Sequence, residues 1–184
     1  MPAPPMMRMT QCSVVHRGDG VFELLHNNGI VYRAALRRQS TRTAVVPICN
    51  ADEKRAVEGQ LLGSVDGASY CVVHEDTPMT IIYSATYGRT PRRMHVVLGN
   101  AELVNKPPRW VESLQAFGLN FDGRVRVASV KNFVLLSGGA DAVMVFGRTP
   151  DRNIYVLDYA PPLTPLLAFA IALSSLDAKC AAVS

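Results

Sequence analysis

The sequence predicts a mainly β fold, a closed barrel of about twelve short, mostly antiparallel strands around one hydrophobic C-terminal α-helix. Short apolar and β-branched segments, separated by Gly, Asp, Asn and Pro, recur from residue 12 to residue 157. Many short strands of this kind form a barrel or a sandwich. A run without any polar residue follows, from Leu166 to Leu173. A helix that is apolar all round must be buried, and a barrel of this size has room for it.

The predicted helix has clear ends. Thr164 is a favourable N-cap, and Pro165 is a favourable first helical residue. The polar residues that close it are Ser174, Ser175, Asp177 and Lys179. The apolar run is much shorter than the ~20 residues that a membrane span needs. We therefore expect a core helix in which Phe169 and Ile171 are almost fully buried.

The strands are predicted by apolar segments between turn residues. Arg17–Gly20 and Asn27–Gly29 have the composition of hairpin turns. Asn50–Glu58 is polar, which predicts a loop or one helical turn, and the ambiguous Trp110–Leu119 favours a strand. The predicted strands are Cys12–His16, Val21–His26, Ile30–Leu36, Thr43–Ile48, Gly59–Ser64, Ala68–His74, Met79–Thr86, Met94–Leu98, Gly123–Val127, Phe133–Leu136, Ala142–Phe146 and Ile154–Leu157.

The length and charge of the chain limit the function classes. Its 184 residues suffice for one domain with a sizeable core, and we expect a disordered segment over residues 1–10 and a single domain over 11–184. A net charge of +4 permits contact with phosphate or an anionic membrane, although a plain solvated surface is favoured. Residues 1–10 lack the apolar core of a signal peptide. The cysteines form no C-x-x-C pair, so reduced thiols in the cytoplasm are expected.

The residue patterns that carry catalysis or cofactor binding are not found. Ser174 and Ser175 lie on the predicted core helix and not in a G-x-S-x-G turn. The four histidines lie on separate segments without ligand-spaced partners, so no metal site is predicted. No glycine-rich phosphate loop is present, and the basic residues are not interleaved with aromatics as in nucleic-acid binders. We expect no enzyme activity, no cofactor, no metal and no nucleic-acid partner.

Two long motifs resemble those of a known family. Asn120–Phe133 is similar to the first motif of the tubby C-terminal domain, and Ala168–Lys179 is similar to the second. Phe146–Arg148 and Leu157–Tyr159 match further family positions, so the resemblance covers Gln11–Cys180. It implies a twelve-stranded barrel around a C-terminal helix, as predicted above. The residues to which it gives a structural role are Gly123, Arg124, Lys131, Asn132, Phe133 and Phe169.

The resemblance also implies a ligand, phosphatidylinositol 4,5-bisphosphate, which tubby domains bind through basic side chains on the barrel surface. Two of these positions correspond to Gln60 and Leu62, neither of which supplies a charge to a phosphate. The third falls near His74–Thr77, which is acidic. The basic residues that remain for a headgroup are Arg37, Arg38, Arg92 and Arg93, and solvated loop charges are the favoured alternative for them.

Two functions therefore remain. The favoured one is a non-catalytic tubby-like domain that serves as a protein-interaction or structural module. The alternative is a membrane-surface adaptor that binds the phosphoinositide. The resemblance implies a ciliary or axonemal protein partner, and we expect a monomeric domain in the cytoplasm, at a cilium or flagellum, or at the membrane periphery.

A last expectation concerns the first motif, where Gly123–Val127 alternates between residue types. On a strand, Val125 and Val127 would face the helix while Arg124 and Arg126 would face away from it. We expect Arg124 to be partly buried with a carboxylate or carbonyl partner, and Arg126 to be solvated.

Overall fold

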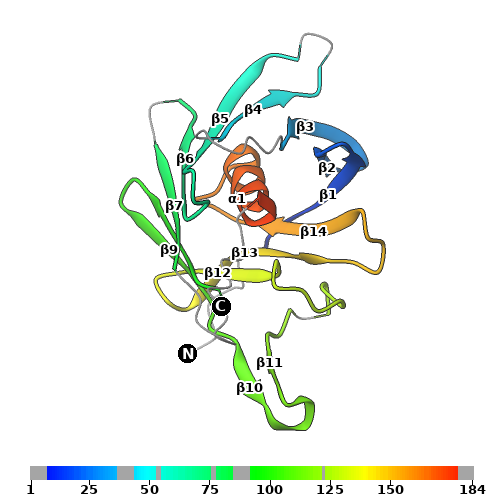
Figure 1. Cartoon of the computed structure of the whole chain (residues 1–184), viewed down its shortest axis with the longest axis vertical. Coiled ribbons are helices and arrows are strands. Elements are labelled where there is room, and N and C mark those ends of the chain that lie inside the picture. The colour runs from blue at the N-terminus through cyan, green and yellow to red at the C-terminus, as the bar shows by residue number, and fades with distance from the viewer. Residues whose placement is uncertain are drawn as a thin grey trace.

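The computed structural model describes residues 8–36, 44–52, 55–75, 78–84, 92–121 and 123–177. Within these ranges, twelve antiparallel strands form a closed barrel in the order β1-β14-β13-β12-β9-β8-β7-β6-β5-β4-β3-β2 (Figure 1). The barrel strands are β1 (Thr10–Gly18), β2 (Val21–His26), β3 (Gly29–Ala35), β4 (Ala44–Asn50), β5 (Val57–Gly63), β6 (Ser69–Val73), β7 (Met79–Tyr83), β8 (Met94–Leu98), β9 (Ala101–Asn105), β12 (Phe133–Ser137), β13 (Asp141–Arg148) and β14 (Ile154–Tyr159). The predicted fold class is confirmed.

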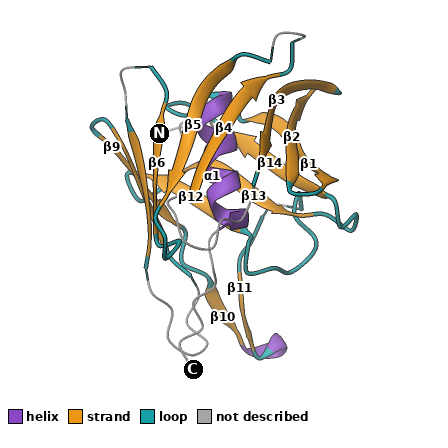
Figure 2. Cartoon of the chain, turned by 45° about the horizontal axis from the view of Figure 1, so that its top comes forward, coloured by secondary structure: helices purple, strands orange, loops and turns teal. Residues whose placement is uncertain are grey.

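The barrel encloses the predicted helix, α1 (Pro165–Asp177) (Figures 1 and 2). Every residue of α1 from Leu166 to Ser175 is buried, and Phe169 and Ile171 have no exposed surface. The backbone N–H of Leu167 donates to the Thr164 hydroxyl at 3.3 Å, as expected of an N-cap. The prediction of a central core helix is confirmed, because inward side chains of the strands surround it.

One hairpin lies outside the barrel. Strands β10 (Arg109–Val111) and β11 (Ala116–Gly118) form a separate two-stranded sheet, joined by the 3₁₀ turn η1 (Glu112–Leu114). Figure 2 shows this hairpin extending away from the barrel. The single strand favoured for Trp110–Leu119 is therefore wrong, because Gln115 adopts a left-handed conformation (φ 46°) that reverses the chain.

Two further strand predictions need correction. Gly123–Val127 forms no strand, since its described residues pair with no neighbouring strand and are held by side-chain contacts instead. Conversely, Ala101–Asn105 was not predicted, although it forms β9 after the tight turn at Gly99. Asn50–Glu58 joins β4 to β5, and its described residues include the turn between these strands, as expected of a polar loop.

The chain start differs slightly from expectation. Strand β1 begins at Thr10, one residue before the predicted start of the domain at residue 11. Thr10 pairs with Tyr159 of β14, which closes the barrel. Residues 1–7 lie outside the described residues. Among the residues that the structure describes, no helix is long and apolar enough to cross a membrane.

Candidate functional site

Gln60 and Leu62, which we predicted to stand at the family's lipid-contact positions, lie on β5. Gln60 is exposed, Leu62 is half-buried, and Leu61 between them points into the core. The two side chains therefore share the outer face of the strand, as a period of two requires. Neither carries a charge, so these two positions offer no cation to a phosphate.

The absence of cations extends over six neighbouring strands. No Lys or Arg occurs on β4, β5, β6, β7, β8 or β9 as described. The strand register aligns outward residues into a continuous row across β4 to β8, made of Val45, Leu62, Cys71, Thr80 and Val97. We call the outward side chains of β4–β9 the apolar wall. The most exposed large apolar residues on these strands are Val45, Val57, Val73, Ile82 and Val104, at 57%, 54%, 47%, 46% and 39%.

Few charged groups interrupt the apolar wall. Glu58 lies at the start of β5, where it accepts hydrogen bonds from the Tyr32 hydroxyl and the Asn50 amide. Glu102 of β9 lies 3.3 Å from Nε2 of His95 on β8. Both permanent charges on these strands are therefore negative, which opposes the approach of a phosphate.

Arg92, a predicted headgroup residue, is engaged inside the molecule. Its Nη2 donates to the Ser175 hydroxyl at 2.6 Å, and its Nη1 donates to the Ser175 carbonyl at 3.4 Å. The guanidinium also lies 4.6 Å from the centre of the Tyr83 ring, at cation–π distance. Arg92 thus complements the negative C-terminal end of α1.

The other headgroup candidates differ from Arg92. Arg93 is exposed at the entry to β8. Arg37 and Arg38 lie outside the described residues. A headgroup role for these four arginines stays a prediction.

Further contacts hold the C-terminal end of α1. The Tyr83 hydroxyl lies 2.8 Å from that of Ser174, and burial raises the pKa of Tyr83 to about 12. The Tyr70 hydroxyl donates to Asp177 at 2.8 Å. Nζ of Lys131 donates to the Leu176 carbonyl at 3.3 Å, which gives this residue a structural contact. These contacts fix α1 within the barrel at the end where its dipole is negative.

The first tubby-like motif crosses the outer side of the barrel near Asp158 of β14. Nε and Nη2 of Arg124 donate to the two Asp158 oxygens at 2.9 and 2.6 Å. Asp158 is 6% exposed, whereas Arg124 is 40% exposed. The paired carboxylate raises the pKa of Arg124. The carboxylate partner that we predicted is confirmed, but the guanidinium is more exposed than predicted.

Val125 of this motif does not face α1 as predicted. Val125 packs against Gly147 of β13, where a methyl group in place of the glycine hydrogen would clash with it. Arg126 is exposed and makes only a long hydrogen bond, 3.4 Å, to the Gly123 carbonyl. Gly123 itself has a φ of +82°, which glycine adopts without strain.

The end of the motif is hydrogen-bonded to β13 and packs against it. The Asn132 side chain donates to the Val127 carbonyl at 2.8 Å and accepts from the Arg148 backbone N–H at 3.0 Å. Phe133 is 3% exposed, and its ring lies 5.4 Å from that of Phe146. Asn132 and Phe133 therefore make contacts that hold the barrel together.

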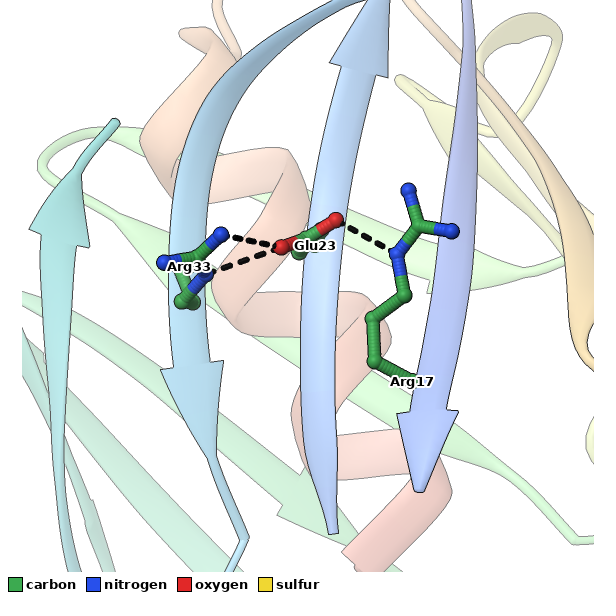
Figure 3. Close-up of polar contacts among 3 residues, drawn as sticks. All are labelled: Arg17, Glu23 and Arg33. Carbon is green, nitrogen blue, oxygen red and sulfur yellow. Dashed lines mark hydrogen bonds and ion pairs between the residues drawn. The ribbon is translucent and has the colours of Figure 1, made fainter. Parts of the chain in front are cut away.

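A cluster that the sequence did not reveal lies on β1–β3, next to the apolar wall. Glu23 of β2 faces outward but is only 4% exposed, because Arg17 and Arg33 cover it from the two neighbouring strands (Figure 3). We call these three residues the Arg–Glu–Arg triad. Only the strand register brings them together, with Glu23 opposite Arg33, so no sequence motif could have shown it.

The described side chains form no group that could hold a metal ion. Within the described ranges, no three His, Cys, Asp or Glu side chains gather closely enough to hold a metal ion. The outer surface described above offers apolar contact on β4–β9 and paired charges on β1–β3 and at Asp158 of β14.

Comparison with known proteins finds a family likeness over the C-terminal part of the chain. Residues 99–178, which hold both motifs, match the model of the Tub family. The C-terminal part of the chain is therefore tubby-like in sequence. Tubby-related protein 3 of Mus musculus is 51% identical over 82 residues, 44% of this chain and 18% of that protein. Tubby-like F-box protein 6 of Arabidopsis thaliana is 44% identical over 91 residues, 42% of this chain and 22% of that protein.

The matched region is thus a small part of these tubby relatives, about a fifth of their length. A solved structure of an Arabidopsis thaliana protein is also similar, with a TM-score of 0.47 and 15% identity over 94% of this chain and 91% of that one. The likeness to the Tub family rests on the region of the two motifs.

Proposed function

We propose that this tubby-like domain is a non-catalytic protein-interaction module that docks a partner protein through the apolar wall. One observation supports this above all: an uncharged row of mostly apolar side chains runs across the five strands β4–β8, and β4–β9 carry no Lys or Arg among their described residues. Contiguous exposed apolar patches are typical of protein–protein contact sites. A partner with apolar side chains would remove this surface from water, at a gain of roughly 25 cal/mol per Å² of apolar surface.

The same wall is unsuited to an inositol phosphate headgroup. Such a ligand needs converging cations, whereas Gln60 and Leu62 are uncharged and the permanent charges on β4–β9 are Glu58 and Glu102. A partner protein with an uncharged, apolar surface meets no such electrostatic penalty. The composition of the wall therefore favours the interaction module over the lipid adaptor.

Affinity capture with matched variants tests this proposal. Ile82→Asp places a charge at the centre of the apolar wall, at a half-exposed position where the fold tolerates it. Arg126→Gln serves as the control, because it changes an exposed side chain on another part of the surface. We expect proteins retained by the wild type and the control to be lost from Ile82→Asp. Identical sets of captured proteins from all three chains would contradict the proposal.

The alternative function is a membrane-surface adaptor that uses Arg37, Arg38, Arg92 and Arg93. The exposure of Arg93 supports it, whereas Arg92 already donates to Ser175. Weak binding to anionic vesicles should then fall steeply with salt, because exposed charges are screened over about 10 Å at 0.1 M. Arg93→Gln should lower this binding, and an unchanged affinity would exclude Arg93 from the site.

The resemblance to tubby proteins supports a ciliary or axonemal partner, and we propose that the domain acts there as a monomer, from the cytoplasm or the membrane periphery. A tagged chain expressed in ciliated cells should concentrate at cilia, and Ile82→Asp should reduce this enrichment if the partner brings the domain there. A uniform cytoplasmic signal from the wild type would contradict the ciliary location.

A further inference from the structure

The Arg–Glu–Arg triad holds two guanidinium groups in fixed positions on the outside of the barrel. Nε of Arg17 donates to Oε2 of Glu23 at 2.7 Å. Nε and Nη2 of Arg33 donate to Oε1 at 2.8 and 2.5 Å (Figure 3). The carboxylate is therefore shared, and it orients both arginines at the same time.

The arginines keep donors for a second acceptor. A guanidinium has five N–H donors, and the hydrogen bonds within the triad use one from Arg17 and two from Arg33. Both side chains remain accessible, at 50% for Arg17 and 35% for Arg33. Two cations around one anion leave a net positive charge, and their fixed orientation lowers the entropy cost of binding a further anion.

We propose that the triad binds a carboxylate from an acidic segment of the protein that docks on the apolar wall. This inference rests on the proposed function and adds the chemistry of the partner. Strand β3, which carries Arg33, pairs with β4, the first strand of the apolar wall, and Arg33 lies opposite Cys49. A partner that covers the wall therefore reaches the triad directly. An apolar centre with charged groups at the rim is the usual arrangement of a protein interface.

A protein carboxylate fits this site better than a membrane does. Membrane-binding segments gather clusters of about 4–8 Lys or Arg, whereas β1–β3 carry only Arg17 and Arg33, offset by Glu23. A net charge this small attracts a charged surface weakly. The directional donors of two oriented guanidinium groups suit a single carboxylate, which accepts them in paired hydrogen bonds.

The test uses the full chain and a defined probe, a hexaglutamate peptide blocked at both ends, with hexaglutamine as the control. Arginine Nε signals in NMR spectra report on each guanidinium. We expect the signals of Arg17 and Arg33 to shift with hexaglutamate and not with hexaglutamine. Arg17→Gln, which leaves Glu23 paired with Arg33, should weaken binding about three- to tenfold, the size of one charge-assisted contact. Arg126→Gln should not change it.

A neutral triad separates binding from folding. In the triple variant Arg17→Gln, Glu23→Gln, Arg33→Gln no buried charge loses its partner, so the fold should persist, and hexaglutamate binding through this site should vanish. Unchanged binding in that variant, or equal shifts with hexaglutamine, would overturn the proposal. So would binding of phosphatidylserine vesicles through Arg17 without any response to the peptide. Ile82→Asp should leave peptide binding intact, so failure of the triad and failure of the apolar wall are distinguished.

Discussion

Strands β1–β3 and strands β4–β9 line the same core around α1, but their outer faces differ in chemistry. Both groups bury alternate side chains around α1, such as Leu24 and Ile81, which have no exposed surface. Outside, β2 carries a nearly buried carboxylate between two arginines, whereas β4–β9 expose valines and isoleucine and carry no Lys or Arg among the described residues. The barrel thus dictates what faces inward, while the outward residues differ between the two groups of strands.

The largest expected effect concerns the inner surface that both groups of strands share. Phe169→Ala removes a ring with no exposed surface from the centre of the barrel. It should cost about 3–5 kcal/mol of unfolding free energy, through lost apolar transfer and the cavity left behind. Denaturant unfolding measures this loss. A loss below about 1 kcal/mol would show that α1 does not hold the barrel together.

A smaller effect should separate the two outer surfaces. Arg33→Gln leaves Glu23 with one cation, and it should cost about 1–3 kcal/mol, less than the loss of a fully buried pair because Arg33 is partly exposed to water. Ile82→Thr on the apolar wall should change stability by less than about 0.5 kcal/mol, since its side chain is already half-exposed. If denaturant midpoints showed equal losses of stability in the two variants, the two outer surfaces would not differ in their contribution to stability.

A second nearly buried carboxylate on the outside of the barrel, Asp158, provides a comparison with the triad. Arg124→Ala leaves the 6%-exposed Asp158 without its cation and should cost about 1–2 kcal/mol, reduced by the exposure of Arg124. Arg126→Ala should cost less than about 0.5 kcal/mol, because Arg126 is solvated. If thermal unfolding shows Arg126→Ala to be the more damaging change, the structural role of Arg124 is wrong.

The triad should also make stability depend on pH. Burial alone would raise the pKa of Glu23, but hydrogen bonds and charges from Arg17 and Arg33 outweigh it and hold that pKa below 4.5. The folded state therefore binds fewer protons than the unfolded state, and the stabilisation is complete above about pH 4.5 and disappears as the pH falls through the lowered pKa. The difference in unfolding free energy between wild type and Glu23→Gln should shrink on acidification. A constant difference would contradict this.

The sequence predicted the parts of the molecule that local patterns specify. The apolar run after Thr164 and Pro165 led to α1, because a helix without a polar side must be buried. Gly123–Val127 failed as a strand because alternation alone does not supply a pairing partner, and Arg124 and Val125 instead contact side chains or backbone of β14 and β13. The outer face of β5 was anticipated from the identities of Gln60 and Leu62.

The triad could not be predicted from the sequence, for a different reason. Arg17, Glu23 and Arg33 come from three strands, and their contacts depend on the register and on the bulge between His16 and Gly18. The continuous row of the apolar wall likewise exists only once β4 to β8 are aligned. Both surfaces depend on the long-range register of the strands, which no short window of sequence contains.

Vesicle co-sedimentation tests most directly whether the apolar wall takes the place of a lipid site. We expect the wild type to bind vesicles containing phosphatidylinositol 4,5-bisphosphate weakly or not at all, because Gln60 and Leu62 supply no charge. The double variant Gln60→Lys, Leu62→Arg should bind them clearly better, since both new cations point outward from β5. Strong binding by the wild type that Ile82→Asp abolishes would show that the wall itself contacts lipid and would contradict its role as a protein-docking surface.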